Sequence, residues 1–194
     1  DSGRIIYDGS CLIADGGEML ARGPRLGHCD ISLTTAVFDV ARSRMRRART
    51  ASFSADPVAD DERLISHPLA WPEPGMDAAS NPPARWEKGA HRDEEAFTRA
   101  VALGLLDYLR KSRSSGWVVS LSGGADSAAV TALCALALRI AERELGFDEL
   151  KSRLGHIGKI EEITDIDGLS RAMITTVYQS TQNSGEVTRS AAAK

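Results

Sequence analysis

Apolar and polar positions follow three different patterns along the chain. In residues 1–50, short apolar runs alternate with turn residues such as Asp8-Gly9 and Asp15-Gly16-Gly17. That alternation predicts short strands joined by tight turns. The predicted strands are Arg4–Tyr7, Cys11–Ala14, Glu18–Gly23 and part of Leu33–Val40. We expect this meander to have too small a hydrophobic core to be stable on its own.

Residues 51–90 show neither a helical nor a strand period. All of the 7 prolines except Pro24 fall in this segment, together with Trp71 and Trp86, which we expect to be exposed. Proline and small polar residues at this density are typical of a linker, or of an extended segment that packs along a neighbouring surface. We therefore expect a domain boundary within residues 51–90.

The helical period returns in residues 91–194. Apolar residues recur every four positions after Asp93, which predicts an amphipathic helix with Asp93 as its N-cap. The later predicted elements are the strand Trp117–Leu121, a largely apolar helix Ala128–Glu142 that ends at Gly146, short helices within 147–165, a helix from Asp165 or Asp167 to Met173, the strand Ile174–Tyr178 and a helix from Glu186. Strands that alternate with helices predict an α/β fold with a parallel sheet.

Two glycines and two serines separate the buried strand before residue 121 from the helix after it. A strand that enters a helix through such a turn presents free backbone N–H groups at the positive end of the helix dipole, where phosphate binds. Glycine lets the backbone approach the anion, and Asp126 is placed to hold a metal ion bound to the phosphates. The candidate nucleotide site comprises Ser120, Leu121, Ser122, Gly123, Gly124, Ala125, Asp126 and Ser127.

Composition narrows the possible partners. The net charge of −3, with 42% hydrophobic and 26% charged residues, is that of an ordinary soluble globular protein and favours neither nucleic acid nor a membrane surface as a partner. Three widely spaced cysteines without a C-x-x-C pair favour a reducing, cytoplasmic setting. The longest apolar run is too short to span a bilayer, and we expect no signal peptide. Both chain ends, at Asp1 and Lys194, resemble truncations.

Three other features of the first half are interpreted as structural. The arginine-rich run 42–49 lacks interleaved aromatic residues, so we expect a solvated segment rather than a nucleic-acid contact. The triplet His28-Cys29-Asp30 suggests catalysis, but three adjacent side chains cannot all converge on one point. Cys11 lies inside a predicted strand, where a small buried thiol is expected.

The loop differs from the commonest phosphate-binding motifs. It lacks the Gly-Lys-Ser/Thr of a Walker A loop and the spacing of G-x-G-x-x-G. Its Ser-Gly-Gly-x-Asp-Ser pattern resembles the loop of the N-type ATP pyrophosphatases, which split ATP into AMP and pyrophosphate. The resemblance implies that Ser122 and Ser127 hold the departing pyrophosphate with backbone N–H groups, that Asp126 coordinates Mg²⁺, and that Ser122 is the active-site serine.

Three other stretches resemble one family within that group, the glutamine-dependent NAD⁺ synthetases. These stretches are Gly3–Gly9, Leu106–Ser112 and Ile174–Arg189. The resemblance implies that 1–50 are the C-terminal end of a nitrilase-like glutaminase domain with an α/β sandwich fold. It further implies that 51–90 link this end to the N-terminal part of the synthetase domain, 91–194, with a Rossmann-like parallel sheet of the adenine-nucleotide alpha-hydrolase type.

The resemblance also implies an activity for the full-length enzyme. Such an enzyme amidates deamido-NAD⁺ to NAD⁺ through an adenylated intermediate, consumes ATP and glutamine-derived ammonia, and is expected to be a homo-oligomer. Ser120 stands where related loops often carry proline, which should leave the phosphate site intact. No glutaminase Glu-Lys-Cys triad is identifiable, and Cys11 is not assigned as its nucleophile. The C-terminal half of the synthetase domain is also missing, so we expect little or no activity from these residues alone.

Two alternatives stay open. One is another ATP-pyrophosphatase ligase, of the GMP synthetase or asparagine synthetase type, although the Gly3–Gly9 and Thr175–Arg189 stretches count against it. The other is a non-catalytic fragment that has kept the loop by descent. Titration with ATP and Mg²⁺ distinguishes a working nucleotide site from a relic.

Overall fold

The structure is a computed structural model that describes residues 5–50, 67–70, 83–180, 182 and 185–193. The chain divides into two compact units, and it passes between them more than once. One unit comprises Asp1–Ser10, Pro24–Ser32 and Ala84–Lys194; we call it the loop-bearing unit. The other comprises Cys11–Gly23 and Leu33–Pro83; we call it the hairpin unit. None of the helices in the described ranges is long and apolar enough to cross a membrane.

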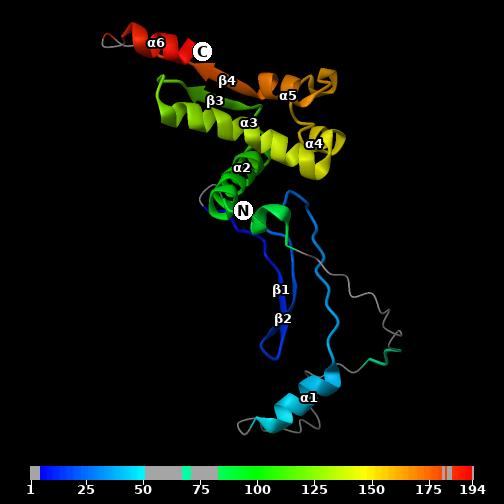
Figure 1. Cartoon of the computed structure of the whole chain (residues 1–194). Coiled ribbons are helices and arrows are strands. Elements are labelled where there is room, and N and C mark those ends of the chain that lie inside the picture. Colours follow the sequence, from blue (N-terminus) through cyan, green and yellow to red (C-terminus); the bar gives the residue numbers. More distant parts are fainter. Residues whose placement is uncertain (1–4, 51–66, 71–82, 181, 183–184, 194) are drawn as a thin grey trace. The chain divides into compact units, whose positions relative to one another are not determined.

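The hairpin unit contains one antiparallel strand pair. Strands β1 (Leu12–Asp15) and β2 (Glu18–Arg22) pair from Leu12 opposite Arg22 to Asp15 opposite Glu18 (Figure 1). Gly16 and Gly17 form the turn with φ angles of 56° and 84°, which glycine adopts at little cost. The predicted second and third strands and the turn between them are thereby confirmed.

The last predicted strand of this region is wrong. Residues 33–39 have no regular structure, and helix α1 (Val40–Arg49) follows them. The Asp39 carboxylate caps this helix by accepting hydrogen bonds from the N–H groups of Ala41 and Arg42, at 2.8 and 3.2 Å. A good N-cap followed by arginines, which are strong helix formers, outweighs the strand preference of three apolar residues. The helix has no buried residue, as expected for a solvated arginine-rich segment.

The loop-bearing unit alternates helices and strands as predicted. Its elements are η1 (Arg85–Lys88), α2 (Arg92–Ser112), β3 (Trp117–Ser120), α3 (Ala125–Leu145), α4 (Phe147–Arg153), η2 (Ile160–Glu162), α5 (Ile166–Met173), β4 (Ile174–Val177) and α6 (Glu186–Ala193). Strands β3 and β4 pair in parallel, with Trp117 opposite Ile174 and Ser120 opposite Val177 (Figure 1). This parallel pair confirms the mixed α/β class.

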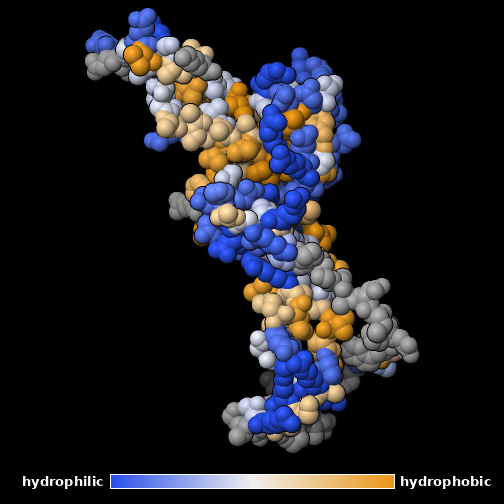
Figure 2. Space-filling view, viewed as in Figure 1, coloured by the Kyte–Doolittle hydropathy of each residue, from blue (hydrophilic) through white to orange (hydrophobic). Residues whose placement is uncertain are grey.

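Among the described residues, two clusters of buried apolar residues hold helices of the loop-bearing unit together, and the smaller consists of Ala102, Ala137 and Ile140. The fully buried members of the larger one come from α2, α3, α4, α5 and the turn after α4: Leu106, Leu109, Leu138, Ala141, Leu150, Leu154, Leu169 and Met173. The core therefore lies at the C-terminal ends of α2 and α3. Hydrophobic side chains are also visible at the surface of both units in the space-filling view (Figure 2).

Element boundaries differ from the predictions in four places. Helix α2 begins at Arg92 after His91, which makes no side-chain cap, so Asp93 is not the N-cap. Helix α3 begins at Ala125 because the glycine turn is only four residues long. Among the described residues of the first predicted strand, only Ile5 makes an isolated bridge. Cys11 is exposed one residue before β1, not buried within it.

Trp86 is half-buried, contrary to expectation, whereas Trp71 lies outside the described residues. The guanidinium groups of Arg25 and Arg99 lie 5.7 and 5.2 Å from the Trp86 ring centroid. Cations at this distance from an indole face are attracted by its quadrupole. Residues 84–88 thus pack on the loop-bearing unit, as the sequence allowed for an extended segment on a neighbouring surface.

Candidate nucleotide site

The loop between β3 and α3 has a defined shape. The Leu121 N–H donates to the Val177 carbonyl oxygen at 2.8 Å, which extends the parallel pair by one bond beyond β3. Gly123 then turns the chain with a φ of 79°. A Cβ atom at this position would lie 2.6 Å from the Thr188 carbonyl oxygen in α6. Gly123 is therefore required both by its left-handed backbone and by the close approach of α6.

The two serine hydroxyls of the loop lie next to each other. Ser127 Oγ accepts from the Ser122 N–H at 3.2 Å and donates to the Gly124 carbonyl oxygen at 3.0 Å. Ser122 Oγ lies 3.2 Å from Ser127 Oγ and accepts from the Gly124 N–H at 3.3 Å. Because the Ser127 proton goes to Gly124, the Ser122 hydroxyl is the donor of the pair. The predicted pair of hydroxyls is thus brought together in the structure.

The N-terminus of α3 is open toward the loop. Its N-cap is Gly124, and no side chain accepts a hydrogen bond from the first turn. The first N–H groups of an α-helix have no partner within the helix, and the dipole of this 21-residue helix adds partial positive charge there. An anion at this end would satisfy those donors. This open helix end is compatible with the phosphate site predicted from the sequence, which stays a prediction.

Asp126 lies in the first turn of α3 and is exposed. A carboxylate beside bound phosphates requires a cation between them, and Mg²⁺ is commonly held by one or two carboxylates together with phosphate oxygens. No group of three or more potential metal-ligating side chains occurs among the described residues. Asp126 therefore fits a metal ion that also binds phosphate, and not an ion held by protein ligands alone.

A hollow of about 390 Å³ adjoins the loop. It is lined by Leu121, Gly123, Gly124 and Ser127 from the loop and by small residues of α3 and α6, among them Ala128, Ala132 and Ala191. Small side chains leave room beside the glycine turn for the rest of a phosphate-bearing ligand. Helix α6, which the sequence analysis did not assign to the site, thus forms one wall of it.

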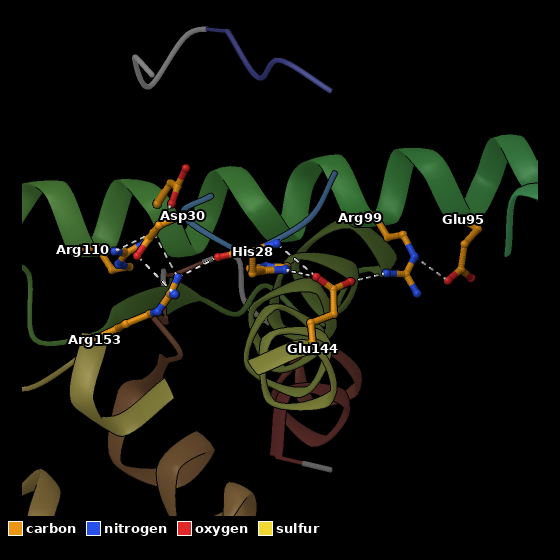
Figure 3. A network of polar contacts seen from close by, with 8 residues as sticks. His28, Asp30, Glu95, Arg99, Arg110, Glu144 and Arg153 are labelled. Atoms are coloured by element: carbon orange, nitrogen blue, oxygen red, sulfur yellow. Dashed lines mark hydrogen bonds and ion pairs between the residues drawn. The ribbon is translucent and has the colours of Figure 1, made fainter. Parts of the chain in front are cut away.

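Cys134 and the His28-Cys29-Asp30 triplet do not line the hollow beside this loop. Cys134 is buried within α3, where burial raises the pKa of its thiol, and Cys29 is exposed. His28 contacts Glu144, whereas Asp30 contacts Arg153 (Figure 3). The three adjacent side chains do not converge, in agreement with their structural interpretation. Their partners lie more than a hundred residues away, so no local pattern identified them.

Comparison with known proteins supports one family. Residues 97–153 match the NAD synthase family. The chain is 33% identical to the glutamine-dependent NAD(+) synthetase of Oryza sativa subsp. indica over 99% of its length, and 29% identical to that of Mus musculus over 100% of its length. It covers 27% of each of those proteins, so it spans about a quarter of the relatives it matches.

A solved structure agrees with these relatives. It is described as a glutamine-dependent NAD(+) synthetase from Cytophaga hutchinsonii and aligns with 100% of this chain at 27% identity and a TM-score of 0.60. The alignment covers 26% of that protein. The chain is therefore similar to the NAD synthase family in residues 97–153, and to glutamine-dependent NAD(+) synthetases along nearly its whole length.

Proposed function

We propose that the loop 120–127 binds the phosphates of Mg²⁺-ATP, and that the whole protein amidates deamido-NAD⁺ to NAD⁺. The observation that carries the proposal is the uncapped N-terminus of α3 behind a Ser-Gly-Gly-x-Asp-Ser turn, at the end of a parallel strand. In this reaction ATP is split into AMP and pyrophosphate, and the AMP activates the carboxyl group of deamido-NAD⁺. Ammonia released from glutamine then displaces AMP and leaves the amide.

Each residue of the loop has a separate task in this proposal. The N–H groups of the first turn of α3 and the hydroxyls of Ser122 and Ser127 hold the pyrophosphate as it departs. Ser122 is the residue that contacts the reacting phosphates most directly. The Asp126 carboxylate would hold Mg²⁺, which neutralises charge that develops on the leaving group.

In this proposal, phosphate binding replaces hydrogen bonds within the loop by hydrogen bonds to the phosphate oxygens. Ser122 Oγ and Ser127 Oγ satisfy each other at 3.2 Å, and each also contacts a backbone group of the loop. An anion at the helix end offers the hydroxyl protons a charged acceptor, and such bonds are stronger than the neutral ones they replace. These bonds within the loop hold its backbone in the turn that the proposed phosphate site uses.

The remaining part of the chain is assigned by the same proposal. Residues 1–50 form the C-terminal end of a nitrilase-like glutaminase domain, 51–90 the interdomain linker, and 91–194 the N-terminal part of a Rossmann-like synthetase domain. Support comes from the relatives, whose names specify glutamine dependence and whose similarity runs along 99% or more of this chain. We further propose that the whole protein is a cytoplasmic homo-oligomer.

Titration of the chain with ATP, with and without Mg²⁺, tests the site. We expect Mg²⁺-dependent binding that Asp126→Ala abolishes, and Asp148→Ala serves as a control because Asp148 lies in α4, outside the loop. ATP binding that neither depends on Mg²⁺ nor changes in Asp126→Ala would falsify the proposed nucleotide site. For the whole protein, AMP formation should require deamido-NAD⁺. AMP formation with xanthosine monophosphate or aspartate would instead favour a GMP or asparagine synthetase.

A further inference from the structure

The C-terminal end of α3 is bound by two segments that lie far from it in the sequence. Glu144 Oε2 accepts from the His28 backbone N–H at 3.0 Å and lies 2.9 Å from His28 Nδ1. Its other oxygen, Oε1, accepts from Arg99 Nη1 in α2 at 2.8 Å. One carboxylate thus joins α3 to α2 and to residues 24–32 (Figure 3).

The chemistry of these contacts determines which nitrogen of the His28 ring donates to Glu144. The ionised carboxylate can only accept, so His28 Nδ1 carries the proton and donates it. The His28 side chain is 2% exposed, and its Nε2 atom is buried without a hydrogen-bond partner. The hydrogen bond to Glu144 therefore orients the ring.

The same short segment is held a second time, at α4. Arg153 Nη1 donates to the His28 carbonyl oxygen at 2.6 Å, and Arg153 also pairs with both carboxylate oxygens of Asp30, at 3.2 Å each. Arg110 of α2 lies 3.8 Å from Asp30. We call His28, Asp30, Arg99, Glu144 and Arg153 the latch. All five belong to the loop-bearing unit.

The latch lies at the end of α3 opposite the nucleotide loop. The buried residues of α3 run from Cys134 to Ala141. Within the described chain, the part of α3 next to the loop has no buried residue. The loop therefore lies about 30 Å along the helix axis from the latch, and the bond from the Leu121 N–H to the Val177 carbonyl oxygen joins it to β4. A rotation or shift of α3 at the latch changes the position of the helix end that faces the loop.

The buried apolar side chains of α3 are both small and large: Cys134, Ala137, Leu138, Ile140 and Ala141. Hydrophobic attraction has no direction, whereas charge-assisted hydrogen bonds depend on both distance and angle. We infer that Glu144 is a positioning residue for the nucleotide loop, because its bonds to His28 and Arg99 determine where the far end of α3 lies.

Two measurements on the full chain test this inference. One is amide hydrogen exchange in residues 121–127, and the other is the affinity for Mg²⁺-ATP, both well below the unfolding temperature. Glu144→Ala should speed exchange in the loop and weaken ATP binding by about three- to tenfold. Glu142→Ala, a matched change on the same helix outside the latch, should alter neither. His28→Ala should reproduce part of the effect of Glu144→Ala.

A conservative variant separates positioning from stability. His28→Asn places an amide nitrogen near the position of Nδ1, so it should restore loop exchange and ATP affinity relative to His28→Ala. If Glu144→Ala lowers the unfolding temperature while loop exchange and ATP affinity match those of Glu142→Ala, Glu144 is merely structural and the inference is wrong. The measurement of Mg²⁺-ATP affinity rests on the proposed function. Absence of ATP binding in the unaltered chain would reject that function, and the exchange comparison alone would then decide on positioning.

Discussion

The two units of this chain bury their apolar residues to very different extents. In the loop-bearing unit, Leu138, Leu150 and Leu169 are 0% exposed. In the hairpin unit, Leu12, Met19 and Phe38 are 57%, 58% and 56% exposed. Helices of 21 residues bring several apolar side chains onto one face, so a few helices suffice to close a core. A two-stranded pair needs a second layer to cover its apolar face, and among the described residues of the hairpin unit most of the large apolar side chains stay exposed. The nucleotide loop is thus built on the unit that carries its own core.

We expect the largest effect from a pair of leucine truncations that test this difference in burial. Leu138→Ala should lower the free energy of unfolding by about 2–5 kcal/mol, because it leaves a cavity in a fully buried site. Leu12→Ala makes the same chemical change at an exposed site and should cost no more than about 0.5 kcal/mol. Urea unfolding followed by circular dichroism measures both. Equal losses would mean that the hairpin unit contributes as much to the cooperative core as the loop-bearing unit.

A pair of glycine substitutions gives an intermediate effect. Gly123 and Gly17 both have left-handed backbones, with φ of 79° and 84°. Alanine at either position should cost about 1 kcal/mol for the strained backbone. Only at Gly123 does the new Cβ also meet a backbone atom, the Thr188 carbonyl oxygen at 2.6 Å, whereas Gly17 has open space around it.

The two glycine variants should therefore differ more in their affinity for ATP than in their free energy of unfolding. Calorimetric titration should show weaker Mg²⁺-ATP binding for Gly123→Ala and unchanged binding for Gly17→Ala. Unchanged binding by Gly123→Ala would show that the close approach of α6 is not needed for the site.

The smallest predicted effect is a pH dependence of the unfolding free energy, which arises from Glu144 in the latch. Burial raises the pKa of Glu144, but hydrogen bonds from His28 and the charges of His28 and Arg99 outweigh it, so the pKa lies below its ordinary value. A carboxyl whose pKa is lower in the folded state stabilises the protein above its unfolded pKa of about 4.3 and loses that contribution as pH falls. Because the side chain is 27% exposed, we expect no more than about 1 kcal/mol.

Unfolding free energies measured from pH 7 to pH 3 test this effect. The wild-type chain should be more stable than Glu144→Gln at pH 7, and the difference should shrink as the pH falls through the folded-state pKa of Glu144. Glu142→Gln provides the baseline for loss of a carboxylate on the same helix. A constant difference between wild type and Glu144→Gln at all pH values would show that the ionised form of Glu144 adds nothing.

Local patterns predicted the loop-bearing unit better than the hairpin unit. The strand, glycine turn and helix around Ser122 and Asp126 follow from residues within a dozen positions of each other, and the structure forms them in that order. Helix α1 was missed because an aspartate at position 39 can serve either a turn or a cap, and only the following backbone decides between them. The roles of Ser122 and Asp126 in ATP binding remain predictions.

The amino-acid sequence by itself determined the order of the elements in the loop-bearing unit and the place of the glycine turn between strand and helix, because helix periods, strand runs and turn glycines act between near neighbours. Only the tertiary structure decided that α6 forms a wall of the loop and that His28 binds Glu144, 116 positions away. No sequence pattern encodes such a pair, since any of the 27 acidic residues could have paired with His28 before folding. Packing of α2, α3 and α4 around one core selects Glu144, and it does so at the end of the helix opposite the loop.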